Sequence, residues 1–357
     1  MTEDHIDPAA VSALLRRAGY DPNAPISPIT GGGNNRVFRV DTRPPLALKL
    51  YFQHPLDRRD RLSAEFACLR YAWNSGLRTL PEPIAASPEH NLGLYGFVHG
   101  RRLGADEIGA DAVGQALALI EALNEPAHRP AATGLPPGSE ACFSLGAHLA
   151  TVSRRLERLA LIEPASPQHR EAQTLLARDL APWWHHQHAA VLAGAARLGL
   201  DTDVELGPEE RWISPSDFGF HNALADEDGR LSFLDFEYAG WDDPAKLIGD
   251  FFSQVEVPVP ERFLPAFTDR LTARAADPAR ERMRFALLLP VYRMKWITIL
   301  LNDFLPAGAQ RRKFARQDQD ETQRLTAQLA KARTALARLP DPSSPHPYEV
   351  SPSHGLR

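Results

Sequence analysis

Cysteine is scarce in this chain, and its two residues, Cys68 and Cys142, lie outside any Cys-x-x-Cys pattern. We therefore expect neither a disulfide framework nor a zinc cluster, and both thiols should be reduced and structural. An excess of basic charge is also missing, because 40 Lys and Arg residues stand against 45 Asp and Glu residues, for a net charge of −5. With the two signs mixed along the chain, no basic stripe indicates a nucleic acid or an anionic membrane as partner.

Long uninterrupted apolar runs are missing too. Residues 1–7 carry three acidic side chains and no apolar run, unlike a secretory signal. The longest apolar stretch, residues 285–305, contains Arg293, Lys295 and Asp303, so we interpret it as a buried helix rather than a membrane span. These absences predict a soluble, cytoplasmic protein with no nucleic acid, no membrane and no obligate protein partner.

The composition is that of an ordinary globular enzyme, with 357 residues of which 43% are hydrophobic and 24% charged. We expect an N-terminal lobe over residues 1–98, a C-terminal lobe over residues 99–339 and, from its five prolines and four serines, a disordered tail over residues 340–357. Apolar spacing predicts mainly strands in the first lobe and mainly helices in the second. The predicted elements are a helix from Asp7-Pro8 to about Gly19, strands at 36–40 and 46–52, a helix over 60–76, strands near 84 and over 92–98, and helices over 105–123, 144–161 and 169–198.

The strongest motif places Asp217 five positions before Asn222, with Asp235 thirteen positions later. Phosphoryl transfer needs a carboxylate that orients and accepts the proton of an incoming hydroxyl, and oxygen ligands for Mg²⁺ at the nucleotide phosphates. Short apolar runs flank the hairpin-type turn around Asp228-Gly229, and Asn222 and Asp235 lie at equal separations from that pair. A hairpin closed there brings the two candidate metal ligands to the same end.

A plainer interpretation stays open for these residues. Asp217 and Asn222 are also common turn and cap residues, and an Asp-Gly pair can close a surface hairpin without any catalytic role. Acids nearby are equally ambiguous, because Glu237, Asp242 and Glu256 could face an amine-bearing substrate or be solvated surface charge.

A glycine run in the N-terminal part fits the same chemistry. It directly precedes a predicted strand, so backbone amides with few side chains around them could approach phosphates. A flexible turn is the alternative. The residues of this segment are Gly31, Gly32, Gly33, Asn34 and Asn35.

On the next strand, period-two alternation puts Ala47, Lys49 and Tyr51 on one face and three leucines on the other. A small residue against adenine and an ammonium for the phosphates are what a nucleotide-binding sheet needs. Glu65, on the helix that follows, could hold Lys49 by an ion pair, although an exposed helix glutamate is the plain alternative. The segment around Phe97 and Val98 is a candidate hinge whose backbone could contact the adenine edge.

Together these residues resemble the aminoglycoside phosphotransferase and choline kinase-like family, relatives of the protein kinases, from about Ile29 to Asp250. The resemblance implies an α+β, bilobal protein kinase-like fold with a small antiparallel sheet lobe and a larger, mainly helical lobe. It also implies ATP and Mg²⁺, a small-molecule hydroxyl acceptor and a segment around Asp243 and Asp250 that braces the catalytic loop. By residue, it implies phosphate contact by the glycine run and Lys49, support from Glu65, catalysis by Asp217, and Mg²⁺ coordination by Asn222 and Asp235.

One departure from the family pattern concerns the residues before Asp217. Family members usually carry His-Gly or His-Arg there, whereas this chain has Ser214-Pro215-Ser216.

The hypothesis favoured by the sequence is transfer of the ATP γ-phosphoryl group to a small-molecule hydroxyl. The alternative is a catalytically weak or inactive nucleotide-binding pseudokinase with a regulatory role.

Overall fold

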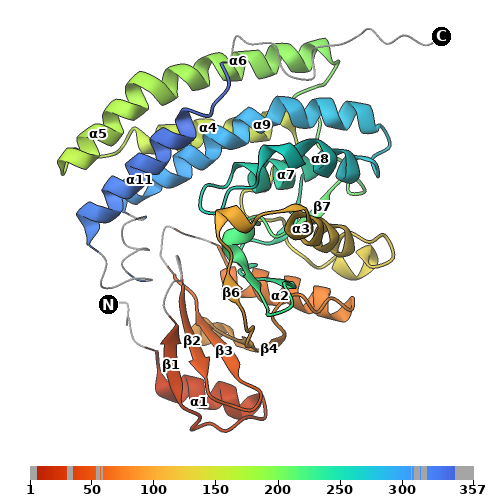
Figure 1. Ribbon diagram of the computed structural model, residues 1–357, viewed down its shortest axis with the longest axis vertical. Coiled ribbons are helices and arrows are strands. Elements are labelled where there is room, and N and C mark those ends of the chain that lie inside the picture. Colours follow the sequence, from red (N-terminus) through yellow and green to blue (C-terminus); the bar gives the residue numbers. More distant parts are fainter. Residues whose placement is uncertain are drawn as a thin grey trace. The chain divides into compact units, whose positions relative to one another are not determined.

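The computed structural model describes residues 6–29, 35–53, 57, 59–306, 308, 314 and 320–341. Its Cα positions form two compact units, each built from three chain segments (Figure 1). Unit 1 comprises Met1–Ser139, Pro215–Trp241 and Ala307–Gln319, and unit 2 comprises Glu140–Ser214, Asp242–Pro306 and Asp320–Arg357. The lobe boundary at residues 98–99 stays a prediction, and nearly all of the predicted tail lies outside the described residues.

Unit 1 begins with an antiparallel sheet in the order β1-β2-β3-β5-β4. The predicted strands and helices of this region are confirmed, with slightly shorter bounds. Helix α1 is capped by the Asp7 side chain, which accepts a hydrogen bond from the Ala9 amide at 2.9 Å, and Gly19 lies beyond its end with φ 82°. The elements are α1 (Pro8–Arg17), β1 (Ile26–Ile29), β2 (Arg36–Val40), β3 (Leu46–Leu50), α2 (Arg61–Asn74), β4 (Pro83–Ser87) and β5 (Leu92–Gly96).

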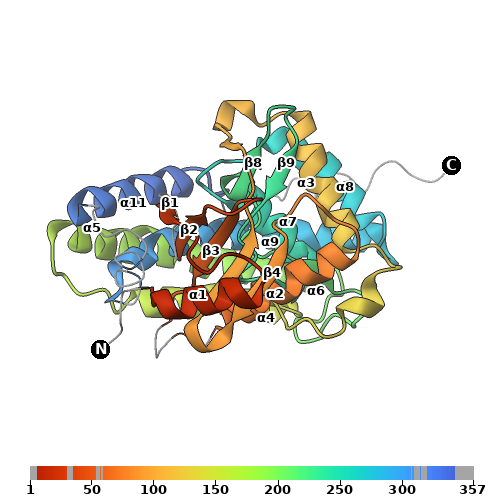
Figure 2. The ribbon, with the colours of Figure 1, turned by 90° about the horizontal axis from the view of Figure 1, so that it is seen from below.

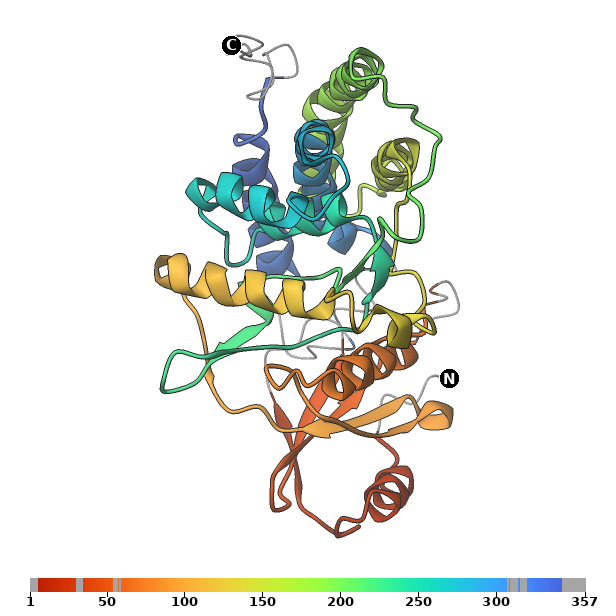
Figure 3. The ribbon, with the colours of Figure 1, turned by 90° about the vertical axis from the view of Figure 1, so that its right-hand side faces the viewer.

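The two faces of this sheet have different roles. Leu46 and Leu48 are fully buried on the face that packs against α1, in one apolar cluster with Leu14 and Leu94. Because side chains alternate along a strand, Lys49 points to the opposite face, where α2 lies. Figure 3 shows the sheet between α1 and α2. The period-two interpretation of β3 is therefore confirmed.

The other strands of unit 1 include the hairpin that carries the predicted metal ligands. Strands β8 (Ala223–Ala225) and β9 (Leu231–Phe233) pair antiparallel, β6 (Arg101–Arg102) adds to β8, and α3 (Ala110–Leu123) lies beside β9 (Figure 2). Ala223 lies opposite Phe233, so the predicted pairing of Asn222 with Asp235 is wrong by one residue.

The physical reason is the length of the turn. The amide of Asp226 donates to the carbonyl of Arg230 at 3.0 Å, which leaves three residues in the loop, and Gly229 takes the left-handed conformation with φ 78°. Leu234 consequently lies opposite Asn222, and its amide donates to the Asn222 carbonyl at 2.8 Å. Asp235 follows directly, so both candidate ligands still lie at the same end of the hairpin.

Unit 2 is mainly helical. Helix α9 lies at its centre and packs against α4, α6, α7, α8 and α11 (Figure 1). One stretch, Pro278–Phe304, is long and apolar enough to cross a membrane, and 83% of its most apolar window is buried, as in a core helix. The helices are α4 (Leu145–Leu159), α5 (Pro167–Leu175), α6 (Ala181–Arg197), α7 (Pro244–Ser253), α8 (Leu264–Thr272), α9 (Pro278–Leu300) and α11 (Glu321–Leu336). Unit 2 also contains the short strand β7 (Trp212–Ser214), whereas strand β10 (Gly240–Asp242) belongs to unit 1 except for its last residue.

The single helix predicted over residues 169–198 is interrupted. A π-helical turn, Leu176–Leu180, separates α5 from α6. Pro182 follows this turn, and its ring lacks an N–H and would clash with the carbonyl four residues earlier in a regular α-helix. The wider π turn accommodates that proline.

A buried ionic network ties α4, α7 and α9 together within unit 2. Asp243, at the start of α7, accepts hydrogen bonds from both terminal nitrogens of Arg284 and pairs with the His148 ring at 2.8 Å. His148 also contacts the Tyr292 hydroxyl. Burial disfavours the charged ring, but Asp243 outweighs burial and raises the pKa of His148 from 6.5 to about 9.

This raised pKa predicts a pH dependence of stability. The stabilisation from charged His148 is fully present below its unfolded-state pKa of 6.5 and is lost as pH rises through about 9. Up to about 3 kcal/mol of the free energy of unfolding should disappear across that window. The free energy of unfolding is measured by urea denaturation at several pH values. In His148→Gln it should depend less steeply on pH across this range than in the wild type. Substitution of the exposed His185 by Gln should leave the wild-type slope against pH unchanged. Equal slopes in wild type and His148→Gln would contradict this assignment.

Candidate active site

The centre of the candidate site in unit 1 is the ammonium group of Lys49. Its Nζ lies 2.6 Å from Glu65 Oε2, on α2, and 2.5 Å from Asp235 Oδ1, just after β9. Lys49 and Glu65 are buried, with 7% and 3% of their surface exposed, whereas the Asp235 side chain is 29% exposed. The structure thus brings together three residues that the sequence predicted for one site.

Charge balance in this cluster favours a cationic lysine. Burial would lower the pKa of Lys49, but the carboxylates of Asp235, Glu65 and Glu237 outweigh burial and hold that pKa well above its ordinary value. Burial, together with Glu237 and Glu65, raises the pKa of Asp235, although Lys49 opposes this shift. Three carboxylates, of Glu65, Asp235 and Glu237, face two cationic groups, Lys49 and Arg61, so a further cation would be stabilised here.

Glu65 is held by more than its ion pair. Its Oε2 also accepts the Tyr51 hydroxyl at 2.7 Å, and Tyr51 in turn lies 2.7 Å from the Tyr95 hydroxyl. The other oxygen, Oε1, accepts the backbone amide of Phe236 at 3.3 Å. Glu65 therefore connects the sheet directly to the residue after Asp235.

The segment Asp235–Glu237 is anchored at each of its three residues. Asp235 has φ 67°, a left-handed conformation that is uncommon outside glycine and that occurs often at functional sites. Glu237 is 2% exposed, accepts a hydrogen bond from the Asn35 amide and lies 3.6 Å from the Arg61 guanidinium. Glu237 is therefore not surface charge, and the surface interpretation is also wrong for the fully buried Asp242, which pairs with Lys246 at 2.7 Å.

The loop that carries Asp217 is closed by its own polar groups. The Asn222 side-chain amide donates to the Asp217 carbonyl at 3.0 Å, and the His221 ring lies 3.1 Å from the Asp217 carboxylate. Ser216, directly before Asp217, has φ 63°. The Asp217 side chain remains 27% exposed, so a second molecule can reach its carboxylate.

The remaining predicted residues lie around this cluster to differing extents. Ala47 shares the Lys49 face of β3 and lies opposite Tyr95 of β5. Phe97 and Val98 follow β5 directly, and the Phe97 amide donates to the Pro45 carbonyl at 3.2 Å. The segment Gly31–Asn34 lies outside the described residues, and its predicted phosphate contact stays a prediction.

Two contributors to the site were not predicted from the sequence, and a third was given another role. Tyr51 could have been found, because alternation had placed it on the Lys49 face. His221 follows Asp217 by four residues, and its ring lies 3.1 Å from the Asp217 carboxylate. Glu237 was considered only as a substrate contact or surface charge, because its partners Asn35 and Arg61 lie far away in the sequence.

Among the described residues no group of three or more His, Cys, Asp and Glu is suited to hold a metal ion.

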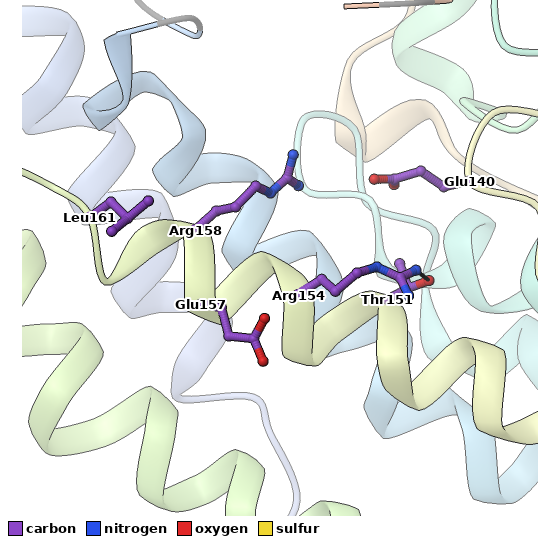
Figure 4. Close-up of a pocket in the computed structure, with 6 residues that line it drawn as sticks. All are labelled: Glu140, Thr151, Arg154, Glu157, Arg158 and Leu161. Carbon is purple, nitrogen blue, oxygen red and sulfur yellow. Dashed lines mark hydrogen bonds between the residues drawn. The ribbon is translucent and has the colours of Figure 1, made fainter. Parts of the chain in front are cut away.

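Unit 2 contains an open hollow of about 500 Å³ along α4, and none of the predicted site residues that the structure describes lines it. Figure 4 shows Arg154 and Arg158 on one side of α4, with Glu157 directed away from them. The residues that line this hollow are Glu140, Thr151, Arg154, Glu157, Arg158 and Leu161.

The antiparallel N-terminal sheet, the helical C-terminal region and the lysine–carboxylate cluster define a kinase-like phosphotransferase. The sequence model of a protein family, described as the phosphotransferase enzyme family, matches residues 25–286, more than half of the chain. The chain belongs to the phosphotransferase enzyme family. No curated protein matches it significantly.

Solved structures share this fold at low sequence identity. A choline/ethanolamine kinase family protein from Mesorhizobium loti is 18% identical, with 92% of this chain and 93% of that chain covered and a TM-score of 0.56. A spectinomycin phosphotransferase in complex with ADP and spectinomycin is 12% identical, with coverages of 92% and 96% and a TM-score of 0.54. An aminoglycoside 2'-phosphotransferase in complex with GDP is 15% identical, with coverages of 93% and 99% and a TM-score of 0.58.

The tyrosine hydroxyls behind Glu65 should contribute measurably to stability. Tyr51→Phe removes one hydrogen bond to a buried carboxylate and one to Tyr95, so we expect a loss of about 1–3 kcal/mol in the free energy of unfolding. Tyr20→Phe is the control, because the Tyr20 hydroxyl makes no hydrogen bond to the described residues, and it should change stability by less than about 0.5 kcal/mol. Urea denaturation measures both. Equal stabilities of the two variants would show that the Tyr51 hydroxyl does not support Glu65.

Proposed function

We propose that this protein transfers the γ-phosphoryl group of ATP to a hydroxyl group of a small molecule in the cytoplasm. The observation that carries the proposal is the buried Lys49, paired with Glu65 and Asp235, together with Asn222 and Asp217 on the adjoining hairpin and loop. Phosphoryl transfer depends on positioning and charge neutralisation, and this set of residues supplies both.

Lys49 has the properties needed for a phosphate contact. Its raised pKa keeps the ammonium charged, and Glu65 fixes its position from behind. Asp235 is the more exposed of its two partners, so Lys49 can exchange this carboxylate for nucleotide phosphate oxygens. Ala47, on the same face of β3, leaves room for the base.

Asp217 would orient the acceptor hydroxyl and accept its proton as the oxygen–phosphorus bond forms and the bond to the ADP leaving group breaks. Its partial exposure gives an acceptor access, and His221 restricts the orientation of its carboxylate. A positioned general base of this kind typically contributes a factor of about 10²–10⁴ to the rate.

The donor set also suits Mg²⁺. Asn222 and Asp235 offer amide and carboxylate oxygens, which are hard ligands of the type that Mg²⁺ prefers together with nucleotide phosphates. Because the Asn222 nitrogen is engaged by the Asp217 carbonyl, its oxygen is oriented away from that bond. When bound there, Mg²⁺ would neutralise phosphate charge.

The acceptor class rests on the family and on its structural neighbours. These neighbours include a choline/ethanolamine kinase family protein and phosphotransferases in complex with spectinomycin and with gentamicin, and all four compounds are small hydroxyl-bearing molecules. The direct test is incubation of the protein with Mg²⁺, labelled ATP and a panel of amino alcohols, sugars, nucleosides and aminoglycosides, with detection of labelled product. Transfer to one panel member supports the proposal, whereas Mg²⁺-dependent ATP binding without any hydrolysis or transfer would favour a pseudokinase.

Substitution of the proposed base should separate chemistry from binding. Asp217→Asn should lower turnover at least about 100-fold while nucleotide affinity stays within about threefold of wild type. Asp228→Asn is the matched control, since this exposed aspartate lies in the hairpin turn, and it should keep wild-type turnover. Initial rates and calorimetric nucleotide titrations provide the two readouts. Unchanged turnover in Asp217→Asn would remove this residue from the mechanism.

A further inference from the structure

We infer that Asn35 is a positioning residue that couples the end of the glycine run to the metal-ligand segment through Glu237. This inference rests on the proposed function, because it assigns Asp235 to the cation. It concerns a pair of buried side chains that lie 202 positions apart in the sequence.

Asn35 uses both ends of its amide. Its nitrogen donates to Glu237 Oε2, and its oxygen accepts the backbone amide of Phe52 at 3.0 Å. The residue is only 4% exposed and lies immediately before β2. A side chain buried at this position and bonded at both ends cannot shift without breaking one of these contacts.

Glu237 is held from the other side as well. Arg61 Nε lies 3.6 Å from Glu237 Oε2, and Arg61 Nη1 donates to the Phe52 carbonyl at 3.0 Å. The carbonyl and the amide of residue 52 are thus both engaged, one by Arg61 and the other by Asn35. The four residues form a closed ring of contacts beneath the candidate site.

The chemistry of this ring requires an amide at position 35. An aspartate there could not donate to Glu237 and would place two carboxylates together in a buried site, and an alanine could neither donate nor accept. Because Glu237 lies only two residues beyond Asp235, a shift of its carboxylate would also shift Asp235. Loss of the Asn35 contact should therefore weaken cation binding and not merely the contact with phosphate.

The experiment measures how strongly Mg²⁺ improves nucleotide binding. A non-hydrolysable ATP analogue, β,γ-imido-ATP, is titrated by calorimetry with saturating Mg²⁺ and with EDTA, and the ratio of the two dissociation constants is compared between variants. Residues that orient a metal ligand from behind typically change metal affinity by about 10–100-fold. In Asn35→Ala this Mg²⁺ enhancement should fall about tenfold, while the affinity in EDTA should change much less.

One variant controls for general destabilisation, and another tests the other end of the contact. Asn124→Ala removes a side-chain amide of equal burial, also in unit 1, that donates to the Ile120 carbonyl, and it should keep the wild-type Mg²⁺ enhancement. Glu237→Gln keeps the volume at the other end of the contact but removes the negative charge that the Asn35 amide and Arg61 hold in place, so it should reduce the enhancement in the same direction. If Asn35 and Glu237 act together, the double variant should lose little more than Asn35→Ala alone. Glu237→Gln also serves as the test if Asn35→Ala does not fold.

The outcomes separate this inference from the proposed function. Equal losses of affinity with Mg²⁺ and with EDTA in Asn35→Ala would mean that Asn35 supports nucleotide binding alone, and would overturn the coupling. An unchanged enhancement in both Asn35→Ala and Glu237→Gln would overturn it too. Absence of nucleotide binding by the wild-type protein would instead overturn the proposed function, and the inference with it.

Discussion

The burial of one positive charge is the constraint on which the N-terminal site depends. An ammonium removed from water costs several kcal/mol unless carboxylates and hydrogen bonds compensate it. Lys49 finds this compensation in Glu65, from the helix behind the sheet, and in Asp235, which follows it by 186 positions in the sequence. The ion pairs therefore join the sheet, α2 and the end of the β8–β9 hairpin into one site.

The two carboxylates that pair with Lys49 are not equivalent. Glu65 is buried and also accepts hydrogen bonds from Tyr51 and from the Phe236 amide, so its position is fixed by three donors. Asp235 is partly exposed, and within the described residues its side chain hydrogen-bonds with Lys49 alone. Under the proposed function, Glu65 would remain the partner of the lysine, and Asp235 would be the partner that turns toward an arriving ligand.

A structural feature of the site could be predicted from the sequence where neighbouring residues determine it, and could not where residues far apart in the sequence determine it. The face of Lys49 follows from the strict alternation of side chains along a strand, so five residues of sequence were enough. The hairpin register was wrong by one because the sequence does not show whether Gly229 sits inside a two-residue or a three-residue turn. The burial of Glu237 could not be read at all, because it depends on Asn35 and Arg61, which are brought to it by the fold.

The same contacts explain why position 222 carries an amide rather than a carboxylate. Asn222 donates its N–H to the Asp217 carbonyl, and only the remaining oxygen is available to a cation. An aspartate at this position would supply more negative charge but no donor, so the Asp217 loop would lose an internal bond that holds it. This hydrogen bond supports the loop in a chain where Ser214-Pro215-Ser216 replaces the histidine-containing segment typical of the family. If the proposed function holds, the Asn222 side chain would link the shape of the Asp217 loop to the geometry of the proposed cation site.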